Sequence, residues 1–484
     1  MKSVKSLLVV GGGTAGLISA IILRQKLNIQ IDVVHSKNIG IVGVGEGSTE
    51  HFKDFMEYVG IHQYDIIREC DATYKGGIMF DGWGDKPYLH NVGTPFNDKN
   101  AQYTYVYAKQ IAENSDYLCI NKTWTSEINS WFLDHPHDMP FNQFHFNTFK
   151  LNEFLIKVAK SKGINVIEDD INDVLLNEQG EIDKLIGSIA TYHYDFYIDS
   201  TGFKKLLISK LGGKWVSYGK YLKMKSAITF PTEDENNYNM WTLSKAMDYG
   251  WMFKIPVWGR HGNGYIFDSD YINAEQAKQE VETLLGRKIE VGKQFNFDPG
   301  AIDRPWIKNC VAIGLSGSFV EPLEATSIGT SIQQAFMLMH KLINYDEKII
   351  ESYNRSVNDI MENIRDFVVL HYQTKKTNTQ FWKDVSALEI PDTLKNRLEL
   401  WRNKLPIDED FNDMSDYILF KGSNHTIVME GLDMFNRSAI KQEYESNHDY
   451  IKNAADEIIR ERIEFEKSIK TLTHKQFLAA IRSY

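Results

Sequence analysis

The sequence predicts an α/β protein, with a Rossmann-type dinucleotide-binding fold, an interleaved second β-sheet and a mostly helical C-terminal region. Three observations predict it. A β-branched run, a glycine loop and a helix-forming segment follow one another at residues 7–23. Strand-like runs typical of the same sheet return much later, at residues 196–202 and 311–315. Beyond residue 330 the sequence is mostly helical in character.

The first strand, the glycine loop and the helix occur in the order that a dinucleotide pyrophosphate requires. The loop reads GGGTAG at residues 11–16. Gly11 allows a tight turn, Gly13 lets the backbone approach a phosphate, and Gly16 lets helix and strand pack closely. The helix points its N–H groups and positive dipole end at the anion. We therefore expect Gly11, Gly13, Thr14, Ala15 and Gly16 to bind the cofactor; the alternative is a glycine turn without a ligand.

The composition is that of an ordinary globular protein. The chain has 484 residues, is 43% hydrophobic and 25% charged, and carries a formal net charge of −11. This acidic balance argues against a nucleic-acid partner. Because the N-terminus leads directly into a predicted strand, we expect no signal peptide, and no apolar run reaches membrane-spanning length. The three cysteines fit neither a disulfide framework nor a metal site, so we expect a cytoplasmic protein without a metal.

The second predicted strand, at residues 29–34, departs from the usual dinucleotide-binding pattern at its end. An acidic residue is expected there to hold the adenosine ribose, but His35 occupies the position. His35 is therefore either a cofactor contact or a structural histidine at the end of a strand.

A second glycine-rich stretch follows at residues 41–49. Glycines at alternate positions suit a loop lying against a flat ring better than a strand interior. We assign Gly43, Val44, Gly45 and Glu46 to this candidate cofactor loop, and the alternative is a surface loop.

The later strands indicate that the chain is interleaved. Residues 51–67 are predicted to form one helix, and residues 174–187 a β-hairpin. The strand near residues 196–199 returns to the nucleotide sheet, whereas residues 223–230 and 264–267 form a second sheet. We expect a discontinuous cofactor-binding domain with a substrate-facing sheet at 1–335. A mostly helical region at 336–484 completes and covers the substrate site.

Several candidate site residues are ambiguous when each is considered alone. Judged by residue type alone, Lys75 is an ordinary surface lysine, and His90 is a structural histidine that forms hydrogen bonds. Trp251 and Phe253, two residues apart on a predicted strand, project to one face and are either core or substrate contacts. The loop at 317–330 combines small residues, hydroxyls and a carboxylate before a helix, which is typical of an anion cradle.

Taken together, these stretches resemble the flavin-dependent halogenases of the tryptophan-halogenase type, up to about residue 385. The resemblance rests on the order of several motifs. These are the glycine loop at 11–16, GVGE at 43–46, TYK at 73–75, DSTGF at 199–203, GWMFKIP at 250–256, EPLEATS at 321–327, and RDF at 365–367 with HY at 371–372 and FW at 381–382.

The resemblance implies an FAD-binding, monooxygenase-like fold and a definite chemistry. FAD arrives reduced from a separate NAD(P)H-dependent flavin reductase, and with oxygen and a halide (chloride, bromide or iodide) it yields hypohalous acid. The acid moves through an internal tunnel to a lysine that matches Lys75. Glu324 matches a glutamate that positions the oxidant or takes the ring proton, and the halide lies on backbone amides that match Thr326 and Ser327. Further assigned contacts are Ile171, Leu315 and Ile328 for the cofactor, and His90, Trp251 and Phe253 for the substrate.

The sequence also departs from this family. Phe253 replaces the second tryptophan of the Trp-x-Trp motif. Ala325-Thr326-Ser327 stands where many members have Ser-Thr-Gly, and this difference suggests tolerance of a larger halide.

The region after about Trp401 lacks the aromatic and acidic lid that clamps free tryptophan. We therefore expect a different or broader set of electron-rich indoles or phenols as substrates. A flavin monooxygenase of the same fold and a redox-silent flavin-binding protein are the alternatives, and the helical surface after residue 330 is a candidate homo-oligomer interface.

Overall fold

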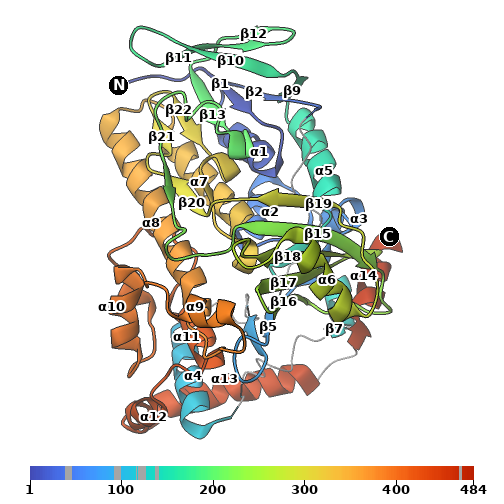
Figure 1. Cartoon of the computed structure of the whole chain (residues 1–484), viewed down its shortest axis with the longest axis vertical. Helices are drawn as coiled ribbons and strands as arrows, with labels where there is room; N and C mark the ends of the chain where they lie inside the picture. Colours follow the sequence, from blue (N-terminus) through green and yellow to red (C-terminus); the bar gives the residue numbers. More distant parts are fainter. Residues whose placement is uncertain are drawn as a thin grey trace. The chain divides into compact units, whose positions relative to one another are not determined.

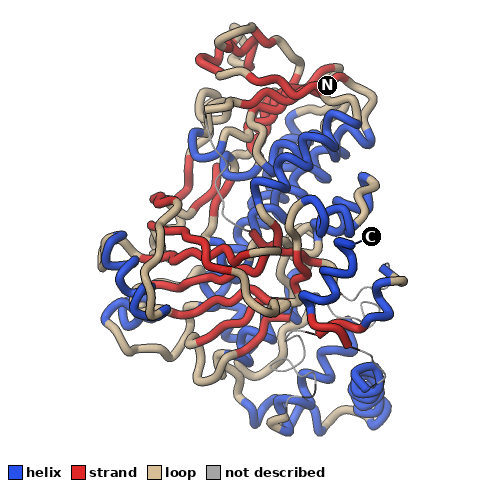
Figure 2. The backbone as a smooth tube through the Cα atoms, turned by 90° about the vertical axis from the view of Figure 1, so that its right-hand side faces the viewer, coloured by secondary structure: helices blue, strands red, loops and turns tan. Residues whose placement is uncertain are grey.

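The computed structural model describes residues 1–38, 46–91, 100–115, 117, 127–136, 141–467 and 471–483. The chain forms two compact units, each assembled from three segments (Figure 1). Unit 1 contains residues 1–72, 146–219 and 298–362, and unit 2 contains residues 73–145, 220–297 and 363–484. Both units mix helices with strands (Figure 2), which confirms the predicted interleaved α/β fold. The predicted boundary at residues 335 and 336 falls inside helix α7 (Thr326–Lys341), within unit 1.

Unit 1 is built on a six-stranded sheet in the order β21-β22-β13-β1-β2-β9. All neighbouring strands are parallel except β21 and β22. The strands are β1 (Ser6–Val10), β2 (Gln30–His35), β9 (Asn165–Glu168), β13 (Phe196–Asp199), β21 (Trp306–Ile307) and β22 (Cys310–Ala312). The predicted strand–loop–helix order is confirmed, because only three residues separate the end of β1 from the start of α1 (Thr14–Lys26).

Two small sheets and further helices complete unit 1. The small sheets contain β10 (Ile171–Leu176), β11 (Ile182–Gly187) and β12 (Thr191–Tyr192), and β14 (Trp215–Ser217), β20 (Gly300–Ile302) and β23 (Ser318–Phe319). The helices are α2 (His51–Val59), α3 (Gln63–Glu69), α5 (Thr148–Ser161), α7, and the first part of α8 (Glu347–His371). The pair β10–β11 confirms the predicted hairpin. The single helix predicted at 51–67 is instead two helices, because Gly60 ends α2 in the left-handed region with φ of 76°.

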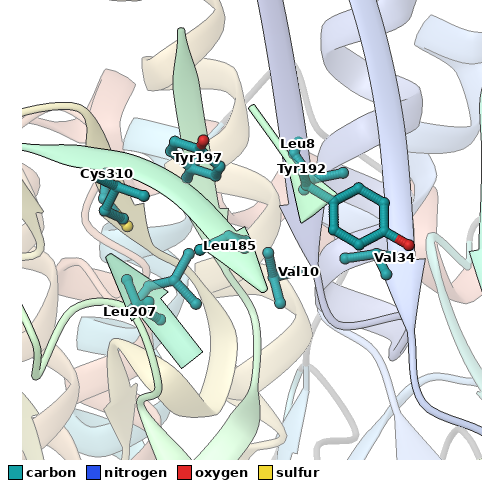
Figure 3. Close-up of a cluster of buried hydrophobic side chains, with 10 residues drawn as sticks. Leu8, Val10, Val34, Leu185, Tyr192, Tyr197, Leu207 and Cys310 are labelled. Atoms are coloured by element: carbon teal, nitrogen blue, oxygen red, sulfur yellow. The ribbon is translucent and has the colours of Figure 1, made fainter. Parts of the chain in front are cut away.

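One buried apolar cluster joins the hairpin of unit 1 to its central sheet. Figure 3 shows side chains of β1, β2 and β13, among them Leu8, Val34 and Tyr197, gathered with Leu185 of β11 and Tyr192 of β12. Burial of such side chains contributes about 1.5–3 kcal/mol each. The cluster therefore fixes the ends of the strands that precede the predicted cofactor loops.

Unit 2 is built on a seven-stranded sheet in the order β19-β15-β18-β17-β16-β5-β6. Only β16 and β5 are parallel neighbours. The strands are β5 (Gly77–Asp81), β6 (Tyr88–Asn91), β15 (Ser226–Glu233), β16 (Trp241–Ala246), β17 (Gly250–Val257), β18 (Arg260–Phe267) and β19 (Lys293–Asn296). Helix α6 (Ala274–Leu285) covers one face, where Met252 and Tyr265 pack against Ala277 and Val281.

The rest of unit 2 consists of short ladders and helices. The ladders pair β4 (Thr73–Lys75) with β8 (Gln143–Phe146) and β7 (Glu127–Asn129) with β24 (Thr471–Thr473). The helices are α4 (Asn100–Glu113), α9 (Gln380–Ser386), α10 (Asp392–Trp401), α11 (Gly422–Gly431), α12 (Arg437–Glu445), α13 (Asp449–Lys467) and α14 (His474–Ser483). The helical C-terminal region is thus confirmed.

Buried histidines make the stability of unit 2 sensitive to acid. Burial lowers the pKa of His425 and of His474 from 6.5 to about 3. Between pH 6.5 and about 3 the unfolded chain therefore binds more protons than the folded protein, so the free energy of unfolding falls as the pH falls. The slope is at most about 1.4 kcal/mol per pH unit for each histidine.

We predict that the urea midpoint of unfolding falls between pH 7.5 and pH 5.5, and falls less in His474→Gln. Glutamine can accept the Tyr74 N–H bond that His474 accepts, but it does not titrate. The control is His193→Gln, because the His193 side chain is exposed. An equal pH dependence in both variants would contradict the prediction.

Candidate functional site

The glycine loop of unit 1 has the conformation that the sequence predicts. Gly11 has φ of 119°, and a Cβ on Gly11 would lie 2.1 Å from the carbonyl oxygen of Ser200. A Cβ on Gly16 would lie 2.1 Å from the carbonyl oxygen of Gly11. The Gly11 N–H donates to Val34 O at 2.8 Å, which fixes the turn beside β2. Only glycine fits at these two positions.

The start of α1 presents open backbone. Gly13 is the residue before the helix, and a Cβ added there would meet no described atom within 4 Å. Among the described residues, no side chain caps this helix start. The N–H groups of Thr14 and Ala15 begin the first turn. The residues predicted to hold a phosphate therefore form a cradle with a positive dipole end.

A side chain that the sequence analysis missed fixes this loop. Asn152 of α5 donates from Nδ2 to the carbonyl oxygen of Gly12 at 2.7 Å and is largely buried. The other side of Gly12 packs on His35, where an added Cβ would lie 2.6 Å from the His35 Cβ. Asn152 was detectable only as a polar residue on the apolar face of an amphipathic helix.

His35 lies at the end of β2, beside an acid on the next strand. Glu168 of β9 is its register partner and forms an ion pair with Lys37. Burial lowers the pKa of His35, so its ring is neutral near pH 7. An acidic side chain therefore lies next to the end of β2, on the neighbouring strand.

Three turns meet at the carboxyl edge of the parallel strands in unit 1. The Ser200 turn contacts Gly11, and a Cβ on Gly314 would lie 2.6 Å from the Ala15 Cβ. The predicted contact Leu315 lies in the short 3-10 helix Gly314–Ser316 of this edge. Asp199 shapes the second turn, because its carboxylate accepts from Thr201, Leu207 and Ile208. Ligands of open α/β sheets bind at this edge.

Other predicted cofactor residues have different surroundings. Gly43, Val44 and Gly45 lie outside the described residues. Glu46 begins β3 (Glu46–Gly47), and burial raises the pKa of its carboxyl to about 7. Ile171, at the start of β10, packs against the apolar cluster of Figure 3.

The predicted halide loop of unit 1 ends in a strained turn. Glu324 is 2% exposed and closes the 3-10 helix Pro322–Glu324. Ala325 follows with φ of 55°, which costs a non-glycine residue about 1 kcal/mol. Helix α7 begins at Thr326 and Ser327, and no side chain of the described residues caps it. Ile328 is buried in its first turn. The amides that were expected to hold a halide thus stand at a helix start behind a buried carboxylate.

Lys75 lies at the end of β4 in unit 2 and is 1% exposed. Its register partner on β8 is Gln143, which is also buried. The preceding residue anchors the strand, because the Tyr74 N–H donates to His474 Nε2 at 3.1 Å. Lys75 is therefore not the surface lysine that its residue type alone suggests.

His90, Trp251 and Phe253 share one face of the seven-stranded sheet. Across the sheet, Phe253 of β17 is the register partner of Ser244 on β16, and Ser244 is the register partner of Phe80 on β5. Ile78 lies two residues before Phe80 on β5 and is the register partner of His90 on β6. Alternation places all of these side chains on one face, opposite the face covered by α6. The rings of Trp251 and Phe253 lie 6.1 Å apart.

His90 itself is held by α11 and by aromatic neighbours. Its Nε2 lies 3.2 Å from Nδ2 of Asn424, whose Oδ1 accepts from the Lys421 N–H. Asn424 therefore donates to Nε2. The His90 ring also packs against Phe367 at 5.4 Å, so it is structurally anchored while remaining on the face of the predicted substrate residues.

Among the described residues there is no group of three or more histidine, cysteine or acidic side chains that could hold a metal ion. Within the same residues, no helix has the length and apolar character needed to cross a bilayer.

Comparisons with known proteins point in one direction. A family model described as tryptophan halogenase matches residues 6–444. The 7-chloro-L-tryptophan 6-halogenase KtzR of Kutzneria sp. (strain 744) is 29% identical over 453 residues, which is 83% of this chain and 86% of KtzR. The structure of Xcc4156, a flavin-dependent halogenase from Xanthomonas campestris, is 28% identical with a TM-score of 0.82 and covers 99% of each chain. A tryptophan halogenase structure from Shewanella frigidimarina has a TM-score of 0.85 at 24% identity, covering 100% of this chain and 98% of its own, and supports the fold.

We predict that Asn152→Ala weakens FAD binding about fivefold to tenfold. The substitution leaves the carbonyl of Gly12 without its donor and loosens the loop, at a cost of about 1 kcal/mol. Titration of FAD fluorescence measures the dissociation constant. Asn172→Ala is the control, because Asn172 makes an exposed hydrogen bond away from the glycine loop. Equal dissociation constants in the two variants would contradict the assigned role of Asn152.

Proposed function

Because this chain belongs to the tryptophan halogenase family, we propose that it uses reduced FAD, oxygen and a halide to halogenate electron-rich aromatic compounds through Lys75 and Glu324. The chain is a flavin-dependent halogenase by class, which favours this function over a monooxygenase or a redox-silent flavoprotein. The observation that carries the proposal is the full burial of Lys75 on β4. Neither alternative function needs a buried lysine at this position.

The glycine cradle fits a dinucleotide. The open backbone at Gly13 and the helix start at Thr14 suit a pyrophosphate, while Gly11 and Gly16 hold the turn. We assign His35, Leu315 and Ile328 to the rest of the FAD site with Glu46, and Ile171 to its periphery. Bound reduced FAD supplies, with oxygen and halide, the oxidising equivalent as hypohalous acid. A separate flavin reductase supplies the reduced flavin.

The start of α7 is the proposed halide site. The amides of Thr326 and Ser327 stand at the positive end of a sixteen-residue helix. The left-handed Ala325 turns the chain into this helix, and strain of this kind is often kept where it serves a function. The neighbouring Glu324 would repel an anion if charged, so we expect its charge state to affect halide affinity.

Lys75 is the proposed site of halogen transfer. Its ammonium donates a hydrogen bond to the oxygen of hypohalous acid and makes the halogen more electrophilic. As the carbon–halogen bond forms, the halogen–oxygen bond breaks, and the oxygen leaves as water with the proton that Lys75 donates. The ring carbon then loses its proton to a carboxylate, the role we assign to Glu324. In the net reaction, the aromatic compound and hypohalous acid give the halogenated aromatic compound and water.

The proposed substrates are electron-rich aromatics such as indoles and phenols. An electrophilic halogen attacks the ring carbons with the highest electron density, and the aromatic face that carries Trp251, Phe253 and His90 offers stacking partners for such rings. KtzR acts on a chlorinated tryptophan by its name. Because the sequence after Trp401 lacks the lid expected for free tryptophan, we propose a broader range.

The experiment that tests this function is mass spectrometry of products from the full chain with FAD, a flavin reductase, NADH and oxygen. Indole, phenol and aniline are each offered with chloride, bromide or iodide. Products whose mass shows a gained halogen support the proposal. Hydroxylated products that form without any halide would overturn it in favour of a monooxygenase.

We predict that Glu324→Gln lowers the rate of halogenated product formation by about 100-fold. Loss of a positioned proton acceptor typically costs a factor in this range. Glu321→Gln is a matched control, because Glu321 is equally buried in the same turn and carries no assigned role. The product rate is measured by chromatography with the same indole substrate. A similar loss in both variants would show that burial, and not the specific carboxylate, matters.

A further inference from the structure

His145 is the centre of a hydrogen-bonded relay that connects the strand of Lys75 to two neighbouring strands. Its Nδ1 lies 3.2 Å from Thr73 Oγ1, and its Nε2 lies 2.9 Å from Thr242 Oγ1. The Thr73 hydroxyl in turn lies 2.8 Å from the carbonyl oxygen of Pro256, to which it donates. The relay thus runs from β16 through β8 to β4 and ends on β17. All four residues are buried.

The direction of each hydrogen bond follows from counting protons. Thr73 uses its only hydroxyl proton on Pro256, so it must accept from His145, and Nδ1 carries the proton. A neutral imidazole has one N–H, so Nε2 accepts from the Thr242 hydroxyl. Every group in the chain of bonds then has a partner. Burial lowers the pKa of His145 well below 6.5, with Lys75 as the second cause, so the ring is neutral near pH 7.

Lys75 lies on the same side of its strand as this relay. Thr73 and Lys75 are two residues apart on β4 and project to one face. Their register partners on β8, His145 and Gln143, project to that face as well. A neutral ring beside the lysine adds no repulsion to its ammonium, whereas a protonated histidine would.

We infer that His145 is a positioning residue for Lys75, which holds β4 in place through Thr73 without placing a second cation beside the amine. The inference rests on the proposed role of Lys75. Strand β4 has only three residues, so its own ladder gives it little rigidity. The relay ties it to β16 and to β17. The β17 side chains Trp251 and Phe253 belong to the proposed substrate face. A small displacement of a reacting group can cost a large factor in rate.

The experiment measures how hypohalous acid is divided between the substrate and the solvent. The full chain turns over with FAD, a flavin reductase, NADH, oxygen and bromide, with indole as substrate. Bromoindole is counted by chromatography, and escaping acid is captured by a 1,3-diketone. The variants are Thr73→Val, which removes the hydroxyl at constant shape, His145→Phe, and His145→Asn, whose amide N–H can replace Nδ1–H. Thr229→Val is the matched control, because Thr229 is a buried threonine of the seven-stranded sheet and takes no part in the relay.

We expect Thr73→Val and His145→Phe to lower the ratio of bromoindole to captured acid at least fivefold, with the KM for indole within twofold of the parent. His145→Asn should regain part of the ratio, and Thr229→Val should keep it. If His145→Phe does not fold, Thr73→Val and His145→Asn decide the question.

A parent-like ratio in Thr73→Val and His145→Asn, together with loss of product in Lys75→Ala, would overturn the inference and leave the proposed function standing. Full product formation in Lys75→Ala would overturn the proposed role of Lys75 and the inference with it. A merely structural role of the relay predicts lower thermal stability with an unchanged ratio.

Discussion

The structure of unit 2 depends on keeping a lysine amine inside a packed interior. A buried ammonium loses its hydration, and a second cation nearby would add repulsion. The chain meets this constraint with neutral histidines, because His145 and His474 both hold β4 by accepting or donating single hydrogen bonds. Burial lowers the pKa of both histidines and makes their rings neutral. The packing that excludes water from Lys75 therefore also keeps its histidine neighbours uncharged.

In unit 1 the proposed binding of anions relies on backbone groups. The glycine loop leads into the start of α1, and the turn at Ala325 leads into the start of α7. Each helix packs closely on its surroundings through a glycine, Gly16 in α1 and Gly329 in α7, where an added Cβ would not fit. Backbone dipoles attract a phosphate or halide without a mobile charged side chain. Three segments of the chain contribute to this unit, which is why its motifs are scattered from residue 11 to residue 327.

Local sequence patterns made much of the fold and part of the candidate site predictable. The glycine loop and hairpin follow from short-range geometry, and the order of motifs pointed to Lys75 and Glu324. What could not be predicted depends on pairs far apart in sequence. Asn152 contacts a residue 140 positions away, and His145 contacts Thr73 across 72 positions. Neither residue type is unusual in its own segment. The split of the helix at 51–67 was hidden because the apolar period continues past Gly60, whose left-handed conformation ends the helix.

We propose that Lys75 directs hypohalous acid that forms elsewhere, from reduced FAD, oxygen and halide. The most direct test compares the parent chain with Lys75→Ala in a single turnover that starts from reduced FAD, with bromide and oxygen, and without and with indole. We predict that both proteins release the same amount of hypohalous acid when indole is absent, and that only the parent converts it to bromoindole. Equal bromoindole from both proteins, or loss of the acid itself in Lys75→Ala, would contradict the account.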